Sequence, residues 1–130
     1  MSLPQTKAAQ YIQLHAESLT SHQIISLLLD GALERIEHTK LALHNSNIDD
    51  AQSLKIKFLG IVEGLQGYLD VERGGDIAVN LFALYSYIIK LIQQSTIENL
   101  AAGTDEARIL LSEVKSGWDE MNIQQQKVAV

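Results

Sequence analysis

Two adjacent glycines, Gly74 and Gly75, interrupt a long stretch of helix-favouring sequence and constrain the fold more than any other feature. Glycine adopts left-handed backbone angles without a steric penalty, so the pair can end one helix. Asp76 follows directly and offers a carboxylate to the free N–H groups at the start of a second helix. The segment therefore predicts that the chain reverses at the double glycine, between two apolar helices.

The composition is that of one globular domain. The 130 residues are 46% apolar and 20% charged, which is sufficient for a single hydrophobic core. The formal net charge of −6 argues against a nucleic-acid partner, because such proteins usually carry a basic face. The absence of cysteine excludes disulfides, zinc–thiolate sites and a cysteine nucleophile.

The chain shows no signal-peptide pattern and no long uncharged span. Its N-terminus lacks a basic region followed by an apolar one. The uncharged apolar run from Ile77 to Ile89 is shorter than the about 20 residues that cross a bilayer. We therefore expect a cytoplasmic protein without membrane insertion.

Apolar residues that recur at helical spacing predict four helices. The first runs from a capping box at 20–23 to about Asn45, and the second from a cap at Asp49 to the double glycine. The third runs from about Asp76 into the mid-nineties, and the fourth begins at a Thr104 cap after a break at Gly103. Because the links are short, the prediction is an all-α, antiparallel up-down four-helix bundle.

The bundle is expected over residues 20–122. Residues 1–19 are predicted to form a short segment or helix packed across it, and residues 123–130 a frayed polar tail. The expected inward-facing residues are Ile25, Leu28, Ala32, Ile36, Leu43, Ala51, Leu54, Phe58, Val62, Leu65, Leu69, Ile77, Leu81, Leu84, Tyr85, Ile88, Ile92, Ala107, Leu111, Val114, Trp118 and Met121.

Apolar side chains beyond these core stripes indicate a surface for a partner. The third helix is apolar over about half of its circumference, with Phe82 and Ile89 on the shoulder of that arc. Leu29 and Leu33 form a similar shoulder on the first helix. These residues could line a groove for a partner helix, or they could pack under the N-terminal segment or at an oligomer contact.

A row of glycines on the second helix also requires a reason. Gly60, Gly64 and Gly67, with Val71 below them, fall on the face opposite the core stripe. Each glycine in a helix costs about 1 kcal/mol relative to alanine. Either small residues let another chain approach closely here, or the N-terminal segment packs on the row, or the row is simply tolerated.

Patterns typical of catalysis and metal binding are missing. No histidine is preceded at three residues by a carboxylate, which excludes the Glu-x-x-His pairs of di-metal bundles. His38 is followed three places later by Leu41, whereas histidine phosphotransfer proteins usually show His-x-x-Lys-Gly. Asp70, Glu72 and Asp76 are interpreted as helix caps. We therefore expect no catalytic residue, no cofactor and no metal.

The segment from Leu69 to Tyr85 resembles the signature of the flagellar secretion chaperone family FliS, Leu-Asp-x-Glu-x-Gly-Gly-Glu/Asp-Ile-Ala-x-Asn-Leu-x-x-Leu-Tyr. The resemblance covers about residues 8–122. Further matches are Tyr11, Leu28, Asp30, Gly31, Ala32 and Trp118. Departures from the family pattern are Ala8 for an aromatic residue, Ser21 for a proline, Leu29 for a tyrosine, and Ser86-Tyr87 for Asp-Tyr.

The resemblance implies a cytoplasmic export chaperone that catalyses no reaction. It would bind the disordered C-terminal region of flagellin, prevent premature polymerisation and deliver flagellin to the flagellar type III export apparatus, with an export-gate protein as a second partner. The residues expected to contact flagellin are Tyr11, Leu29, Leu33, Ile56, Gly60, Gly64, Gly67, Val71, Phe82, Tyr85 and Ile89. The alternatives are a histidine phosphotransfer protein and a generic dimerising helical-bundle adaptor.

Overall fold

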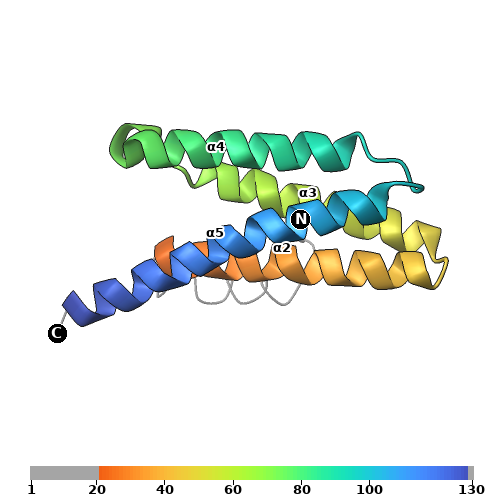
Figure 1. The fold of residues 1–130 in the computed structure, drawn as a ribbon, viewed down its shortest axis with the longest axis horizontal. Helices are drawn as coiled ribbons and strands as arrows, with labels where there is room; N and C mark the ends of the chain where they lie inside the picture. Colours follow the sequence, from red (N-terminus) through yellow and green to blue (C-terminus); the bar gives the residue numbers. More distant parts are fainter. Residues whose placement is uncertain (1–20, 129–130) are drawn as a thin grey trace, which may run out of the picture.

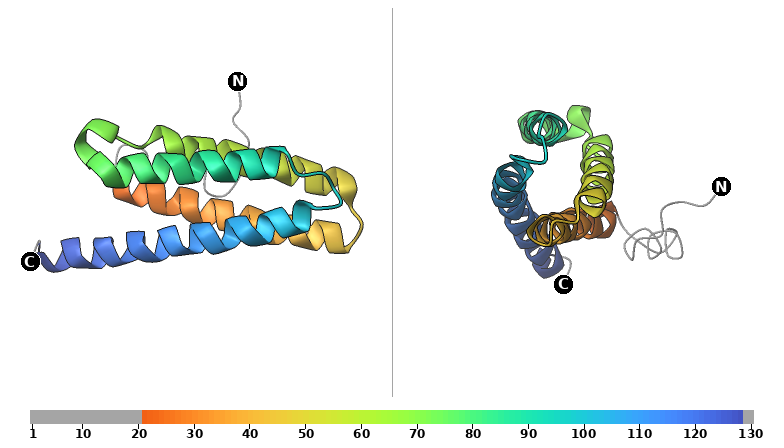
Figure 2. Two further views of the ribbon diagram at one scale, coloured as in Figure 1. Left: turned by 45° about the horizontal axis from the view of Figure 1, so that its top comes forward. Right: turned by 90° about the vertical axis from the view of Figure 1, so that its right-hand side faces the viewer.

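The computed structural model describes residues 21–128, which form four helices joined by short links. The helices are α2 (Ser21–His44), α3 (Ile48–Gly67), α4 (Val71–Gln93) and α5 (Leu100–Val128). Consecutive helices run antiparallel (Figures 1 and 2), and each packs on the next, with α5 returning to α2. The predicted all-α bundle is confirmed over these residues. The expected N-terminal segment, including Thr20 of the capping box, lies outside the described residues.

The link between α2 and α3 is a tight turn at 45–47. Ser46 has a positive φ of 58°, and Asn47 is the N-cap of α3. The Asn47 side chain accepts a hydrogen bond from the Asp50 N–H at 3.2 Å, which satisfies one of the free donors at the helix start. The predicted turn is confirmed, whereas the predicted cap at Asp49 is wrong. Asp49 lies within the first turn of α3, where its negative charge interacts favourably with the positive end of the helix dipole.

The chain reverses between α3 and α4 before the double glycine. Tyr68 ends α3, and its N–H donates to the Gly64 carbonyl at 3.2 Å. Asp70 is the N-cap of α4, because its carboxylate accepts from the Arg73 N–H at 3.2 Å. The link therefore begins earlier than predicted, because Asp70 caps a first helical segment upstream of the double glycine, and a second segment follows the kink at Gly75.

The double glycine forms a kink at which two helical segments of α4 meet, so the predicted helix break there is confirmed, although it lies within Val71–Gln93. Gly75 has φ 57° and ψ −137°, angles that side-chain-bearing residues rarely adopt. A Cβ added to Gly74 would lie 2.6 Å from the Cβ of Ala78, so the neighbouring position is also restricted to glycine. The long straight part of α4 therefore follows Gly75, close to the predicted start near Asp76, although the helix itself begins at Val71.

α5 begins at Leu100, ahead of the predicted break at Gly103 and Thr104. Both residues are buried inside the helix, and the Thr104 hydroxyl donates to the Ala101 carbonyl at 2.9 Å. A Cβ at Gly103 would lie 2.8 Å from the Ser95 hydroxyl oxygen. The predicted cap at Thr104 is wrong, because α5 already begins at Leu100. Gly103 instead allows α5 to pack closely on the α4–α5 link.

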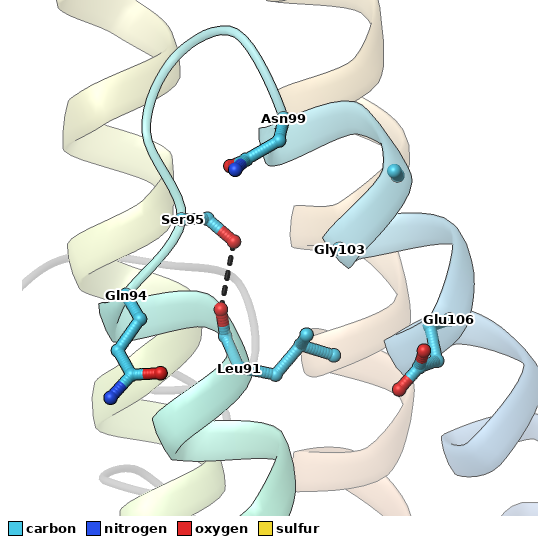
Figure 3. Close-up of a pocket in the computed structure, with 7 residues that line it drawn as sticks. Leu91, Gln94, Ser95, Asn99, Gly103 and Glu106 are labelled. Atoms are coloured by element: carbon cyan, nitrogen blue, oxygen red, sulfur yellow. Dashed lines mark hydrogen bonds between the residues drawn. The ribbon is translucent and has the colours of Figure 1, made fainter.

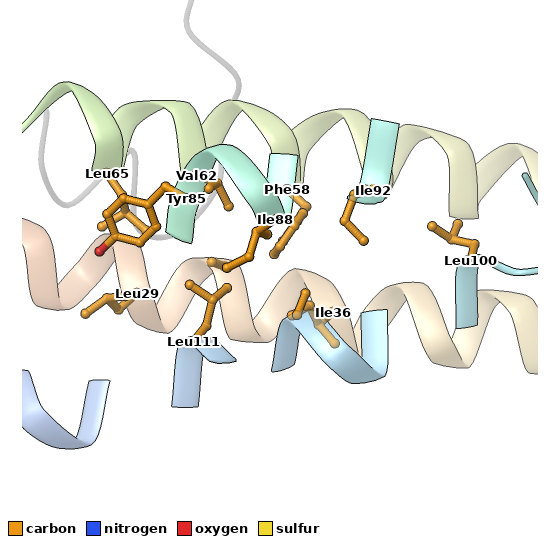
Figure 4. Packing of buried hydrophobic residues seen from close by; sticks show 12 residues of the cluster. Leu29, Ile36, Phe58, Val62, Leu65, Tyr85, Ile88, Ile92, Leu100 and Leu111 are labelled. Carbon is orange, nitrogen blue, oxygen red and sulfur yellow. The ribbon is translucent and has the colours of Figure 1, made fainter. Parts of the chain in front are cut away.

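The main hydrophobic core runs along the bundle, and all four helices contribute to it (Figure 4). Its largest fully buried apolar side chains are Leu29, Ile36, Phe58, Val62, Leu65, Ile88, Ile92, Leu100 and Leu111. Most of the predicted core residues are buried or pack partly buried against this cluster. A second, smaller cluster of Ala42, Ala51 and Leu54 joins α2 to α3. Two predictions are wrong, since Ile77 is 73% exposed and Met121 is 46% exposed.

Both exceptions have a geometric cause. Ala78, one residue after Ile77, takes the inward position two helical turns before Tyr85. Met121 lies in the last third of α5 (Leu100–Val128), the helix whose C-terminal end extends past the other helices (Figure 1). The α5 backbone is helical through Val128, and the bundle boundary expected at 122 stays a prediction.

Replacing Phe58 tests the core. We expect Phe58→Ala to lower the free energy of unfolding by about 3–5 kcal/mol, because it removes a fully buried ring and leaves a cavity. Ile56→Ala, two residues away on an exposed side chain, is the control and should change stability by less than about 0.5 kcal/mol. Urea unfolding followed by circular dichroism measures both, and equal losses would contradict the core assignment.

A second pair of variants tests the kink. Gly75→Ala should destabilise the fold by about 1–3 kcal/mol, because alanine must adopt the unfavourable angles at this position. Gly60→Ala, at an open position inside α3, should stabilise it by up to about 1 kcal/mol. Thermal unfolding of both variants decides the point, and a stabilising Gly75→Ala would show that the kink is not required.

Candidate functional site

α4 exposes more apolar surface than its packing in the bundle uses. It buries only a narrow stripe, made of Ala78, Tyr85, Ile88 and Ile92. Its exposed large apolar side chains are Ile77, Val79, Phe82 and Tyr87. No charged residue occurs between Asp76 and Lys90, whereas the outward face of a surface helix is usually charged. The outer surface of α4 is therefore suited to contact with another apolar chain.

α4 is also long enough to span a bilayer. Over Glu72–Gln93 its length and composition meet the requirement for a membrane-crossing helix, which no other helix in the described range 21–128 does. This is a longer stretch than the uncharged run considered from the sequence. Core helices of water-soluble bundles meet the same requirement, so the length of α4 assigns no membrane role.

α3 and α4 lie side by side, and we call their outward sides, with Ile56 and the glycines on α3 and Phe82 on α4, the α3–α4 face. The Gln66 amide donates to the Phe82 carbonyl at 3.1 Å and to the Ser86 hydroxyl at 2.7 Å, so the Phe82 side of α4 lies next to α3. On α3, a Cβ added at Gly60, Gly64 or Gly67 would meet no heavy atom of the described residues within 4 Å. With respect to the described helices, the space above this glycine row is thus open. Ile56 shares the face and is 70% exposed.

The remaining predicted contact residues lie elsewhere. Leu29 is buried in the core, so its expected place on the shoulder of the first helix is wrong, whereas Tyr85 is buried as its expected inward position requires. Leu33 and Ile89 are half-buried and pack against the core cluster. Val71 starts α4 and does not continue the α3 glycine row, and Tyr11 is outside the described residues. Contact of any of these residues with flagellin stays a prediction.

A second feature is an apolar pocket of about 300 Å³ at one end of the bundle. It forms where the start of α2, the end of α3, the start of α4 and the later part of α5 meet. Its apolar lining includes Ile25, Leu65, Leu69, Leu81, Val114 and Trp118. We call it the end pocket. Asp70, Arg73 and Ile77 also border it, which places the double-glycine segment beside the pocket.

Trp118 is held in the pocket wall by two contacts with α2. Its indole N–H donates to the His22 carbonyl at 3.2 Å. Its ring stacks on the His22 imidazole, with centroids 4.3 Å apart and planes inclined by 18°. Since the two residues belong to the first and last described helices, these contacts tie α5 to α2 at the pocket.

Tyr85 also borders the end pocket, and its hydroxyl is neutral at physiological pH. Burial raises the pKa of Tyr85 to about 12, because the phenolate loses solvation among apolar side chains. The pocket thus combines apolar walls and an uncharged phenol with Asp70 and Arg73 at its border, and its apolar part suits an apolar side chain.

A different cavity, of about 370 Å³, lies at the α4–α5 link (Figure 3). Its polar groups are largely engaged within the protein. The Ser95 hydroxyl donates to the Leu91 carbonyl at 2.7 Å, and Glu106 accepts from the Tyr87 hydroxyl. In the described part of the chain no three histidine, aspartate or glutamate side chains gather to hold a metal ion. The end pocket and the α3–α4 face are thus the stronger candidates for a binding site.

The family profile described as "Flagellar protein FliS" matches residues 4–126. The chain belongs to the FliS family. The predicted resemblance is confirmed along nearly the whole sequence.

Three FliS relatives show how far the similarity extends. The flagellar secretion chaperone FliSB of Pseudomonas aeruginosa is 40% identical over 114 residues, covering 85% of this chain and 90% of that protein. FliS of Vibrio cholerae is 36% identical over 109 residues, covering 84% and 79% respectively. FliS of Salmonella typhimurium is 32% identical over 117 residues, covering 86% and 87%.

Sequence reasoning did not find the end pocket in this FliS chain. It placed Ile77 in the core, whereas the structure places it at the pocket with its side chain mostly exposed. One signal was available, because the spacing from Ile92 and Tyr85 back to Ala78 continues the buried stripe by sevens and leaves Ile77 outside it. The pocket forms where parts of four helices meet, and no local sequence pattern indicates that meeting.

The raised pKa of Tyr85 predicts a loss of stability at high pH. The unfolded chain releases the phenolic proton near pH 10, but the folded chain keeps it to about 12, so unfolding becomes easier as pH rises between these values. We expect Tyr85→Phe to flatten this decline, as measured by urea unfolding at pH 9 and pH 11. Tyr68→Phe, at an exposed tyrosine, is the control, and an equal effect of both variants would rule out Tyr85 as the cause.

Proposed function

We propose that the protein is a cytoplasmic export chaperone that binds the disordered C-terminal region of flagellin. Binding would prevent premature polymerisation and keep flagellin ready for the flagellar type III export apparatus, where an export-gate protein is a second partner. The relatives are named flagellar secretion chaperones, which supports the role. The structural observation that carries it is the uncharged, exposed side of α4 beside the open glycine row of α3.

The physical basis is folding coupled to binding. A disordered segment can cover a long apolar surface and become helical as it does so, because apolar anchors at helical spacing enter the groove. The glycines of α3 let a partner backbone approach closely, and Phe82 and Ile56 offer exposed apolar area next to them. In this proposal Leu33, Ile89 and Tyr11 contribute only where the client reaches past that face.

Binding alone accounts for this role, and no reaction is proposed. His38 lies on the exposed surface of α2, but Leu41 occupies the place of the lysine typical of phosphotransfer proteins. A dimerising adaptor would use the same apolar surface on a second copy of the chain, and sedimentation distinguishes it from the chaperone.

A calorimetric titration tests the proposal. The full protein is titrated with the C-terminal segment of flagellin from the same organism, and we expect binding at micromolar concentration or tighter. Gly64→Leu should weaken it about tenfold or more, because leucine blocks the open row. Gly117→Leu is the matched control, since Gly117 on α5 also faces open space, and it should bind like the parent.

Three results would count against the proposal. Absence of binding at micromolar concentration would remove the flagellin client. Equal affinities of the two glycine variants would remove the α3–α4 face as the contact surface. A stable dimer whose formation Gly64→Leu abolishes would assign that face to a second copy of the chain.

A further inference from the structure

We propose that the end pocket receives one large apolar side chain of the client and that the acidic residues beside it bind a lysine or arginine next to that anchor. The inference rests on the proposed function, because it specifies what kind of client sequence the chaperone selects. The partner is thus a segment in which a bulky apolar residue and a basic residue are neighbours.

The shape and lining of the pocket favour a single anchor. At about 300 Å³ it lies at the lower end of ligand-pocket volumes, which suits a side chain better than a cofactor. Its walls come from all four described helices, so the cavity exists before any partner binds. Ile77 at the pocket is 73% exposed, so burying it against an anchor removes apolar surface from water.

The segment that borders the pocket carries more negative than positive charge. Segment 70–76 holds the carboxylates of Asp70, Glu72 and Asp76 against the single guanidinium of Arg73, and of these four residues Asp70 and Arg73 line the pocket. Arg73 Nε lies 3.6 Å from Asp70 Oδ2, and its side chain is 91% exposed. Glu72 and Asp76 are exposed and form no ion pair within the described range. A basic side chain can therefore add to this group without displacing a buried pair.

The end pocket borders α4, the helix that also carries Phe82 of the proposed client surface. Ile77 and Leu81 line the pocket, and the uncharged stretch of α4 begins directly after Asp76. One extended segment can thus place its basic residue at Asp76, its anchor in the pocket and its following apolar residues along α4. Charge complementarity at one end would then fix the register of an otherwise non-directional apolar contact.

Trp118 provides the readout, because it is the only tryptophan of the chain and lines the pocket. The probe is the flagellin C-terminal segment, synthesised without tryptophan, together with a version in which its lysines and arginines are replaced by glutamine. We expect the first to change Trp118 emission on binding, with an affinity that falls as salt rises. The neutralised version should bind about tenfold more weakly at low salt.

Two sets of variants separate the pocket from its charges. Asp70→Asn, Glu72→Gln and Asp76→Asn together remove the charges, while asparagine at position 70 keeps the helix cap. The matched control, Asp49→Asn, Asp50→Asn and Glu98→Gln, removes three charges at the opposite end of the bundle. We expect about tenfold weaker binding in the first set and unchanged binding in the control. Val114→Phe fills the pocket and should abolish the Trp118 response.

Each outcome decides between the proposals. If the segment binds without changing Trp118 emission and both charge sets bind alike, the inference is overturned and the chaperone function stands. If the segment does not bind at all, the proposed function fails first. A Trp118 response that depends on protein concentration alone would assign the pocket to a second copy and overturn the inference.

Discussion

The hydrophobic contact that joins Ile36, Phe58, Ile88 and Leu111 brings all four described helices together (Figure 4). The four helices contribute unequally to this core, and the exposed apolar residues of the surface result from that inequality. α4 enters the core through a single narrow stripe, and α4 and α5 make the least contact of the four neighbouring pairs. Apolar residues on the other sides of α4 are consequently left for contacts outside the bundle, and the end pocket lies where its first turns meet α5.

Ion pairs join α5 to α2. Lys115 pairs with Asp30 at 3.2 Å and Lys40 with Asp105 at 2.9 Å, and both pairs join α5 to α2. The hydrogen bond to Lys40 lowers the pKa of Asp105, so this contact persists as the pH falls toward the usual carboxylate range. Exposed ion pairs contribute little individually to the free energy of folding, but both of these pairs hold α5 against α2. α4 is connected to α2 and α5 mainly through the hydrophobic core and through α3.

The sequence predicted the helices and most of the core, but not where the helices end. Periodicity averages over many residues, so Ile36, Phe58 and Ile88 were found without difficulty. Helix ends depend on single residues whose roles are ambiguous, because glycine serves as a cap, a kink or a site of close packing. The sequence predicts a helix break at both Gly75 and Gly103. Gly75 forms a kink between two helical segments of α4, whereas Gly103 lies inside α5 and allows this helix to pack closely on Ser95. Likewise Asn47 and Asp70 cap helices for which Asp49 and Asp76 were also available.

The exposed glycine row has a consequence for how such a chain changes over generations. Alanine at Gly60 or Gly64 would meet none of the described residues and would favour the helix, so random mutation judged by the folding of residues 21–128 alone would replace these glycines. A lineage that retains them forgoes stability that is one substitution away. The number of related chains that keep glycine at each position therefore measures a demand made by something other than the folded monomer.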